Sequence, residues 1–222
     1  MLNIFRPKLS LIIPVRNQTA TIESSLRIIS ALPIPKELIV VDDFSTDGTK
    51  EILKRLQPEL KLKLIMHALH RGRGASVING SAHAKGEFVM VIDTSSEPDF
   101  TYINSLLELA EGNKPDMLIS AYSDPDNGLS GKFNRLLFRV LFGKRINSIS
   151  SGYKICRLSK FQTMQFNPGV KAFNTSWLLK ALLRGMTIKE IKLKSESVKN
   201  AGSGESGFAI MREILTSRLA RK

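Results

Sequence analysis

Short apolar runs rich in β-branched residues alternate with segments of helical periodicity over the first 125 residues, and this alternation restricts the fold more than any other feature of the chain. The apolar runs predict strands at residues 8–15, 37–41, 61–66, 87–92 and 117–121. The periodic segments predict helices at residues 21–32, from the turn at 46–49 through Leu56, at 74–84 and at 100–110. Strands that are apolar along their whole length are typical of parallel sheets between two helical layers. The sequence therefore predicts an α/β fold.

The pattern changes after residue 123. Residues 124–128 indicate a loop, and a serine-rich stretch ends at Gly152. Beyond the loop, the sequence predicts helices at 132–142, 177–184 and 208–222, a strand at 187–193 and a glycine-rich loop at 201–207. No internal repeat is present in the sequence. We therefore expect one α/β domain with a distinct C-terminal extension and not two independent folds.

The positive charge of the chain is concentrated in its C-terminal part. The net charge is +13, with 42% hydrophobic and 24% charged residues, a balance typical of globular proteins. Residues 1–131 hold 14 Lys and Arg against 16 Asp and Glu, whereas residues 132–222 hold 19 against 4, a net of +15. Such a field indicates an anionic partner, unless it is only a solvated surface that aids solubility. Aromatic residues are only 7% and no nucleic-acid recognition module is present, so we expect no nucleic-acid partner.

The sequence offers no sign of a membrane-spanning or secreted protein. Its longest apolar runs are about five residues, whereas a spanning helix needs about 20. The N-terminus lacks the pattern of a secretory leader. The single cysteine, Cys156, permits no internal disulfide and agrees with a reducing compartment. We expect a cytoplasmic location. A peripheral position on the inner face of the membrane is compatible with it.

Polar residues follow the predicted strands at the point where each strand ends. In open α/β sheets, ligands bind outside the carboxyl ends of the strands, so these residues are the first candidates for a site. Asp43 is placed to accept hydrogen bonds from a nucleobase edge, and Asp93 to meet a ribose or a metal-bound diphosphate. Some of these motifs also have a purely structural interpretation. Residues 47–48 would then form a turn with a helix cap, and residues 72–74 a loop that opens a helix. The three histidines lack a metal-binding spacing, and the first turn lacks the glycine pattern of dinucleotide-dependent oxidoreductases.

The order of these motifs is more specific than any one of them. The chain reads LIIPVRN at 11–17, IVVDDFSTDGT at 39–49, GRGA at 72–75, GEFVMVID at 86–93 and SGYK at 151–154. Over about residues 8–195 it closely resembles the family-two glycosyltransferases of the GT-A fold, nearest to the dolichol-phosphate mannose synthase type. The resemblance implies a Rossmann-like, mostly parallel sheet flanked by helices, with a basic C-terminal helical extension. Within a single domain over 1–222, it implies a nucleotide-binding half at 1–123, an acceptor-side half at 124–200 and a terminal loop and helix at 201–222.

The resemblance also implies a donor site for a nucleotide-diphospho-sugar. The residues that would bind it are Pro14, Arg16, Asn17, Gln18, Val41, Asp43, Ser45, Arg73, Asp93, Thr94 and Ser95. Asp93 would be the first acid of the family's Asp-x-Asp metal motif, with Glu97 as a second ligand for Mg²⁺ or Mn²⁺, which would neutralise the leaving diphosphate. The candidate catalytic residues are Asp93, Glu97 and Asp99. The family's reaction moves the sugar to an acceptor, in this subgroup a polyprenyl phosphate.

The sequence departs from the family pattern at several charged positions. Ser95 replaces the second acid of Asp-x-Asp, Tyr122 stands where the subgroup has Arg, and in the stretch Gly204-Glu205-Ser206-Gly207 the last glycine replaces a basic residue. One interpretation is a weakened metal held by Asp93 and Glu97, since Mg²⁺ often uses one or two carboxylates. Another is neutralisation of the diphosphate by basic residues alone, from the set Arg71, Arg73, Lys154 and Lys199. A third is an impaired homologue that acts as a nucleotide- or partner-binding module.

The two C-terminal helices combine apolar and basic residues. In the first, Phe133, Leu136 and Val140 belong to an apolar stripe beside Arg135 and Arg139. Such helices lie in the membrane interface and bind anionic headgroups, or else they pack on the sheet as ordinary core. We therefore expect an anionic membrane surface or a lipid phosphate acceptor as a partner, and the sequence does not indicate an oligomeric state.

Overall fold

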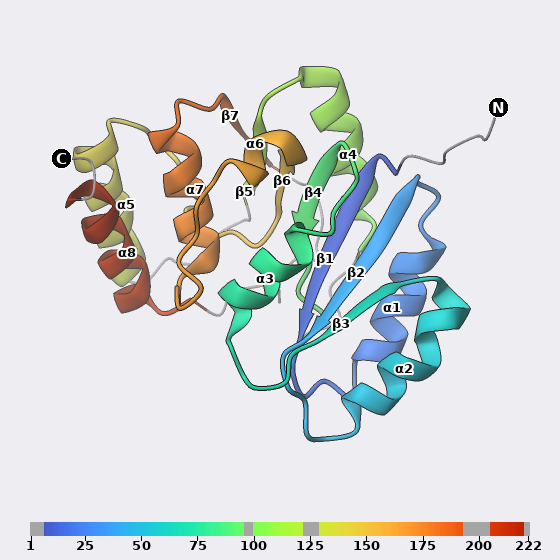
Figure 1. Ribbon diagram of the computed structural model, residues 1–222. Helices are drawn as coiled ribbons and strands as arrows, with labels where there is room; N and C mark the ends of the chain where they lie inside the picture. The colour runs from blue at the N-terminus through green and yellow to red at the C-terminus, as the bar shows by residue number, and fades with distance from the viewer. Residues whose placement is uncertain (1–6, 96–99, 122–128, 193–204, 220–222) are drawn as a thin grey trace.

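A computed structural model of the chain describes residues 7–95, 100–121, 129–192 and 205–219 (Figure 1). Its strands are β1 (Leu9–Val15), β2 (Lys36–Asp42), β3 (Lys63–Met66), β4 (Phe88–Val91), β5 (Met117–Ala121), β6 (Lys154–Arg157) and β7 (Ile188–Lys192). In the described residues they form one seven-stranded sheet in the order β3-β2-β1-β4-β6-β5-β7. Neighbouring strands are parallel except at β6, which runs antiparallel to both β4 and β5. The prediction of a mostly parallel sheet is confirmed.

Helices cover both faces of this sheet (Figure 1). They are α1 (Ile22–Ala31), α2 (Thr49–Leu60), α3 (Arg73–Ser81), α4 (Tyr102–Asn113), α5 (Leu129–Phe142), α6 (Leu158–Gln162), α7 (Phe173–Leu183) and α8 (Gly207–Leu219). Successive strand residues face opposite sides, so Leu11 and Ile13 pack under α1, α2 and α4, whereas Ile12 packs with α3 and α7. The apolar runs of β1, β2 and β4 are therefore buried on both faces of the sheet, whereas β3 at the edge is only partly buried.

Strand β6 and helix α6 were not anticipated from the sequence. Strand β6 has only four residues and begins with a lysine, so it carries little of the apolar pattern that marks a strand. It lies between β4 and β5, where Cys156 pairs with both Val89 and Met117. This strand joins the C-terminal half to the sheet of the N-terminal half. Helix α2 also runs beyond its predicted end, through Pro58 to Leu60.

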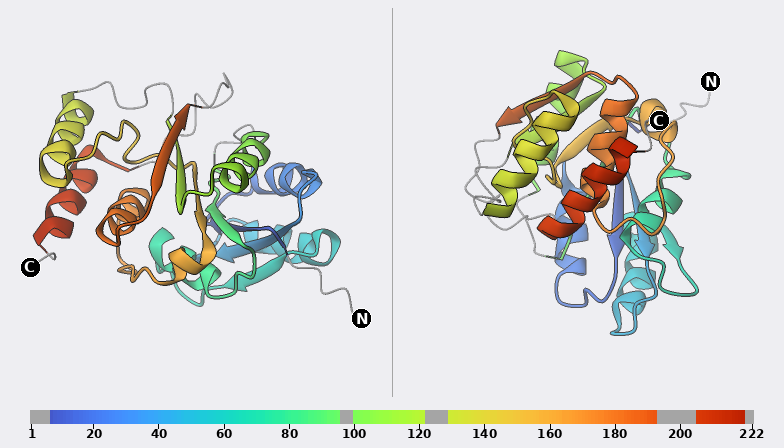
Figure 2. Two further views of the ribbon diagram at one scale, coloured as in Figure 1. Left: turned by 90° about the horizontal axis from the view of Figure 1, so that it is seen from above. Right: turned by 90° about the vertical axis from the view of Figure 1, so that its left-hand side faces the viewer.

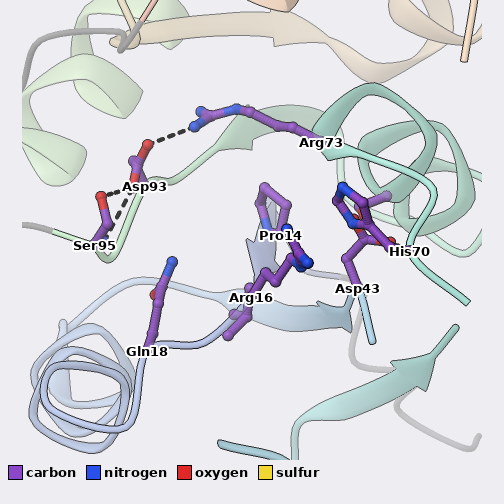
Figure 3. A pocket seen from close by; sticks show the side chains of 10 residues that line it. Pro14, Arg16, Gln18, Asp43, His70, Arg73, Asp93 and Ser95 are labelled. Carbon is purple, nitrogen blue, oxygen red and sulfur yellow. Dashed lines mark hydrogen bonds and ion pairs between the residues drawn. The ribbon is translucent and has the colours of Figure 1, made fainter. Parts of the chain in front are cut away.

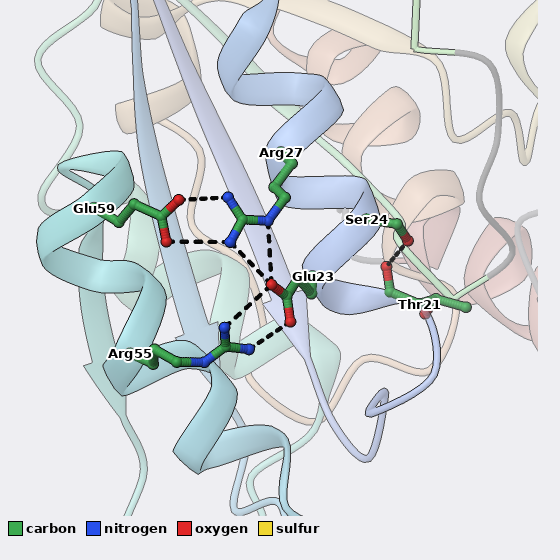
Figure 4. A network of polar contacts seen from close by, with 6 residues as sticks. All are labelled: Thr21, Glu23, Ser24, Arg27, Arg55 and Glu59. Carbon is green, nitrogen blue, oxygen red and sulfur yellow. Dashed lines mark hydrogen bonds and ion pairs between the residues drawn. The ribbon is translucent and has the colours of Figure 1, made fainter.

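A network of charged side chains joins α1 to α2 on the side of the molecule away from α5 (Figure 4). Arg27 of α1 donates to Glu23, 2.9 Å away on the same helix, and to Glu59 of α2. Arg55 of α2 also donates to Glu23. Exposed pairs of this kind contribute little singly, so the network sets how the two helices pack more than the stability of the fold.

The C-terminal helices α5 and α8 pack against each other at the edge of the molecule (Figure 2). One face of each is part of the core, through Phe138 of α5 and through Ile210 and Ile214 of α8. The side-chain amide of Asn134 donates to the Gly207 carbonyl at 3.1 Å. In the C-terminal extension, α8 thus packs on α7 and α5 packs on α8. None of the helices in the described ranges has the length and apolar character that crossing a bilayer requires.

Candidate functional site

A cavity of about 270 Å³ opens where β1, β2 and β4 end (Figure 3). It is lined by Pro14, Val15, Arg16, Gln18, Asp43, His70, Arg73, Ser76, Asp93 and Ser95. Asp93 and Ser95 lie at one end, Asp43 and His70 lie at the other, and Pro14 is between them (Figure 3). The loops after separate strands therefore meet at the carboxyl edge of the sheet, as expected for an open α/β fold.

The loop after β1 is held by hydrogen bonds to the loop after β2. Asn17 adopts a left-handed backbone conformation with φ of 51°, which Asn tolerates better than most residues. Its backbone N–H donates to the Ser45 hydroxyl at 3.0 Å, and its side-chain oxygen accepts from the Thr46 N–H at 2.9 Å. The Thr94 hydroxyl donates to the side-chain oxygen of Gln18 at 2.6 Å. Asn17, Ser45 and Thr94 thus position the loops, while Gln18 faces the cavity.

Asp43 is the centre of a second network, which holds the segment after β3. Its carboxylate accepts from the backbone N–H groups of Arg71 and Gly72, both at 2.8 Å. The Nδ1 atoms of buried His67 and half-exposed His70 lie 2.9 and 2.7 Å from it. Burial raises the pKa of Asp43, but the hydrogen bonds from His67 and the two backbone N–H groups outweigh it and hold the pKa below its usual value. Of the four partners, His70 is the one that a ligand can displace, because its side chain is 48% exposed.

Replacing Asp43 with alanine is expected to lower the free energy of unfolding by about 3 kcal/mol, because two backbone N–H groups and buried His67 lose their acceptor. Chemical denaturation of the purified protein measures this. Because the pKa of Asp43 is lowered by folding, its stabilising effect is present above the usual value of 3.8 and is lost as the pH falls through the folded value. Glu51→Ala, which removes an exposed carboxylate from the neighbouring helix α2, is the control and should cost far less. An equal loss in the two variants would contradict the role of Asp43.

Arg73 and Asp93 close the other end of the cavity. Arg73 is the first residue of α3, directly after Gly72, whose φ of 87° lets the chain turn into the helix. Its guanidinium donates to one carboxylate oxygen of Asp93, and Ser95 donates to the other through its N–H at 3.0 Å and its hydroxyl at 2.6 Å. Burial raises the pKa of Asp93, but the Arg73 charge and the Ser95 hydrogen bonds outweigh it and lower the pKa. Asp93 is therefore an ionised carboxylate whose charge is already balanced.

The described residues at this end do not form a divalent-ion site by themselves. Within the described ranges no three His, Cys, Asp or Glu side chains gather closely enough to hold a metal. Asp93 supplies one carboxylate, of which one oxygen faces a guanidinium and the other faces Ser95. Two of the predicted acids, Glu97 and Asp99, lie outside the described residues. A Mg²⁺ site uses one or two carboxylates together with substrate oxygens and waters. The described residues offer one carboxylate, that of Asp93, which is already hydrogen-bonded to Arg73 and Ser95.

Two buried ionisable side chains, Lys154 and Glu205, interact electrostatically with each other and with Arg73. Lys154, the first residue of β6, is fully buried and donates to the Ser151 carbonyl. Glu205 accepts from the Asn174 N–H at 2.5 Å and from the Thr175 hydroxyl at 2.7 Å, so it caps the start of α7. Burial lowers the pKa of Lys154 to about 7, against the opposing effect of Glu205. Burial likewise raises the pKa of Glu205. Arg73 acts on both groups, so the donor cavity and the C-terminal segment share one electrostatic network.

The structure brings together most of the donor-site residues named from the sequence. Pro14, Arg16, Gln18, Asp43, Arg73, Asp93 and Ser95 line the cavity. Val41 does not, because its side chain is fully buried in the sheet. His70 and Ser76 line the cavity but are not among the residues that the family resemblance assigns to the donor. The position of His70, just before the glycine-rich turn that opens α3, was the one sequence signal that pointed to it.

Comparisons with known proteins give a family and a fold for this site. The model of glycosyl transferase family 2 matches residues 10–179. The dolichol-phosphate mannosyltransferase of Pyrococcus furiosus is 27% identical over 199 residues, which are 84% of this chain and 55% of that protein. The GalNAc(5)-diNAcBac-PP-undecaprenol beta-1,3-glucosyltransferase of Campylobacter jejuni is 28% identical over 131 residues, 58% of this chain and 42% of that protein. The chain thus spans about half the length of these curated relatives.

Solved structures share the architecture at lower sequence identity. Glucosyl-3-phosphoglycerate synthase of Mycobacterium tuberculosis, solved with Mg²⁺ and UDP, superposes with a TM-score of 0.70 at 21% identity and covers 97% of this chain and 79% of that one. Residues 1–349 of S. aureus TarS superpose with a TM-score of 0.68 at 23% identity and cover 95% of this chain and 65% of that one. These likenesses confirm the GT-A fold expected from the motifs. Since the family model matches well over half of its residues, the chain belongs to glycosyl transferase family 2.

Proposed function

We propose that this chain is a glycosyltransferase that moves a sugar from a nucleoside-diphosphate sugar to an acceptor. The observation that carries the proposal is the cavity at the carboxyl edge of the sheet, with Asp43 at one end and the pair of Arg73 and Asp93 at the other. Such a cavity offers hydrogen-bond acceptors to a base and positive charge to a diphosphate. The structure of the mycobacterial protein of this fold was solved with Mg²⁺ and UDP, which supports a nucleoside diphosphate as the ligand.

In this proposal the base and the ribose lie along Pro14, Arg16 and Gln18, next to Asp43. A base N–H takes the place of His70 on the Asp43 carboxylate, because the other three donors are backbone groups or buried. The loop after β3 would then keep its shape when the nucleotide binds. Asn17, Ser45 and Thr94 contribute to nucleotide binding indirectly, because their hydrogen bonds position the loops of the site. Val41 contributes indirectly as well, through the packing of β2.

The diphosphate lies at the other end, where Arg73 faces Asp93 and Ser95. The bond between the sugar and the diphosphate breaks more easily when positive charge meets the leaving oxygens. A guanidinium supplies this charge in a planar fork that matches phosphate. Asp93, Glu97 and Asp99 stay the candidate catalytic acids, with Asp93 and Glu97 the candidate ligands should Mg²⁺ or Mn²⁺ enter with the substrate.

Calorimetric titration with UDP and GDP tests the proposal. We expect one of the two nucleotides to bind, and we expect addition of EDTA or Mn²⁺ to change the dissociation constant by no more than about threefold, because Arg73 is already in place. Absence of binding by both nucleotides, with and without Mn²⁺, would overturn the proposed function. Binding without sugar transfer to any polyprenyl phosphate would instead support the impaired, nucleotide-binding module.

Ser95→Asp restores the second acid and is expected to make nucleotide binding depend on Mn²⁺, with a gain of about tenfold in affinity when the ion is present. A second carboxylate beside Asp93 supplies the oxygen ligand that the serine lacks. The comparison is a titration with and without Mn²⁺, and Ser95→Asn, which adds similar bulk without the charge, is the matched control. If both variants respond equally to Mn²⁺, the diphosphate does not lie against Ser95.

We further propose that the acceptor is a lipid-linked phosphate and that the chain works at a membrane surface. The names of the two curated relatives refer to dolichol phosphate and to a PP-undecaprenol, which supports an acceptor of this class. The excess of 19 basic over 4 acidic residues in residues 132–222 supports an anionic partner for this half. In this arrangement residues 1–123 hold the nucleotide and residues 124–200 contribute to the acceptor side.

A further inference from the structure

Helix α5 carries apolar side chains on two opposite faces. Its buried face consists of Gly131, Asn134 and Phe138, which follow one another at helical spacing. The opposite face carries an apolar stripe that consists of Leu129, Phe133, Leu136 and Val140, with side chains 88%, 53%, 59% and 71% exposed. A helix on the surface of a globular protein normally has polar residues on its outer face. The packing of the core explains the buried face of α5 but not the stripe.

A basic hollow of about 310 Å³ lies beside the stripe. It is lined by Arg135, Leu136, Arg139, Arg145, Ile146 and Asn147, and Leu136 belongs to the stripe as well. Glu190 of β7 shapes the hollow, because its carboxylate accepts from the backbone N–H groups of Asn147 at 3.0 Å and Ser148 at 2.9 Å. The carboxylate is therefore engaged with the loop that follows α5.

The arginines of this basic hollow have a surplus of positive charge. Arg139 and Arg145 are exposed, and in the described part of the chain neither forms an ion pair with an acidic side chain. The neighbouring helix α8 adds two exposed apolar side chains, Phe208 and Leu215, which are 71% and 42% exposed. Helices α5 and α8 lie side by side on the same outer side of the molecule (Figure 2).

We propose that α5 docks on an anionic phospholipid membrane, with the apolar stripe in the interfacial layer and the basic hollow bound to the phosphate of a lipid headgroup. The inference rests on the proposed lipid-linked acceptor, since that acceptor gives the protein a reason to sit at a membrane. Amphipathic helices bind membranes through buried apolar area together with attraction to anionic lipid. Arginine forks bind phosphate oxygens in pairs, so Arg139 and Arg145 around one hollow select a phosphate group over a diffuse negative charge.

The charge and the shape of this face favour a membrane over nucleic acid. Single-stranded nucleic acid binds along basic grooves with aromatic side chains on which bases stack. The stripe has one aromatic residue, Phe133, among aliphatic side chains, which suit acyl chains better than bases. The stripe and the basic hollow also share Leu136, so lipid tails and a headgroup phosphate would be met at the same place.

Vesicle flotation with the full chain tests the inference. The vesicles consist of phosphatidylcholine alone, or of phosphatidylcholine with about one-third phosphatidic acid or phosphatidylserine. We expect the wild type to bind both anionic vesicles and to prefer phosphatidic acid, whose phosphate is the more exposed group. Arg139→Ala/Arg145→Ala should lower the partition coefficient by about thirtyfold, since each basic residue near an anionic surface contributes about fivefold. Phe133→Ser/Val140→Ser should lower it by about tenfold and leave the lipid preference unchanged.

Two further variants separate a phosphate site from a merely basic surface. Arg139→Lys/Arg145→Lys keeps the charge but loses the guanidinium fork, and we expect about a fivefold loss and a weaker preference for phosphatidic acid. Lys54→Ala/Lys63→Ala removes the same charge from α2 and β3, away from α5, and should bind as the wild type does. Thermal melts should match for all of these variants, because the side chains concerned are exposed.

Several outcomes would overturn the inference. These are absence of wild-type binding to anionic vesicles at low salt, equal losses in the arginine-to-alanine and control variants, and full binding by the arginine-to-lysine variant. Binding of single-stranded RNA by the same arginines without any vesicle binding would also overturn it. Titration with UDP and GDP on the same preparations keeps the two proposals apart. Normal nucleotide binding without vesicle binding would reject only the docking of α5 on a membrane. Vesicle binding without nucleotide binding would reject only the proposed transferase function.

Discussion

Arg73→Ala is expected to weaken the binding of a nucleoside diphosphate by about 10- to 100-fold while the binding of the bare nucleoside stays unchanged. The guanidinium lies at the end of the cavity opposite Asp43, where it already faces an ionised carboxylate. Its loss removes charge-assisted hydrogen bonds to the diphosphate and leaves the contacts to the base in place. Calorimetric titration with UDP and uridine, or with GDP and guanosine, measures the difference directly.

Neighbouring variants sharpen this result. Arg71→Ala is the matched control, because Arg71 holds Asp43 through its backbone N–H and its side chain does not line the cavity. Arg73→Lys keeps the charge but not the fork, so it should recover part of the affinity. An equal loss for nucleoside and nucleoside diphosphate would mean that Arg73 shapes the cavity and does not bind the phosphates.

Asp93→Asn tests the other member of the pair. It removes a carboxylate that balances Arg73, so nucleoside diphosphate should bind at least as tightly as before. Any transfer activity that depends on a divalent ion should be abolished, because the one described carboxylate at this end is lost. Full retention of transfer activity in the presence of Mn²⁺ would refute a role for Asp93 in the reaction.

Glu205→Ala is expected to lower the free energy of unfolding by about 3 kcal/mol, because it uncaps α7 and leaves Lys154 buried without its counter-charge. Glu205→Gln removes the charge but leaves one acceptor oxygen, so it keeps the hydrogen bond from the Asn174 N–H or from the Thr175 hydroxyl and not both. The double variant Lys154→Met/Glu205→Gln should recover most of the stability that Glu205→Gln loses, since no buried charge is then left unpaired. Denaturant unfolding of the full chain measures all three.

The effect of Glu205→Gln has a definite pH dependence. The folded-state pKa of Lys154 is about 7 against 10.5 for a free lysine, so the folded protein binds fewer protons between these values and its stability rises with pH across that window. Without Glu205 the folded-state pKa of Lys154 falls further. Burying the charged lysine then costs more folding stability at low pH. The stability gap between wild type and variant should be widest at about pH 6 and nearly closed at about pH 9. A gap that does not change with pH would show that Glu205 acts only as a helix cap.

The strands and helices of the first half were predictable because their signals are local. Leu11 and Ile13 sit in a run that is apolar on both faces, and such a run has few alternatives to a buried strand. Strand β6 was not predictable, because its four residues begin with Lys154 and are stabilised by pairing with two strands that are distant in the sequence. The interpretation of α5 as a core helix is confirmed for Phe138, which is buried, whereas the membrane-facing interpretation of its other face, where Val140 is exposed, stays a prediction.

The sequence by itself determined the family, the α/β fold and the strand ends that carry Asp43, Arg73 and Asp93, because these depend on local periodicity and on the order of motifs along the chain. Only the tertiary structure decided what these side chains contact. It places Arg73 against Asp93, and it brings Glu205 within electrostatic reach of Lys154 across 51 positions of sequence. Contacts of this kind depend on how helices and strands pack in space, and no periodicity within a segment records them.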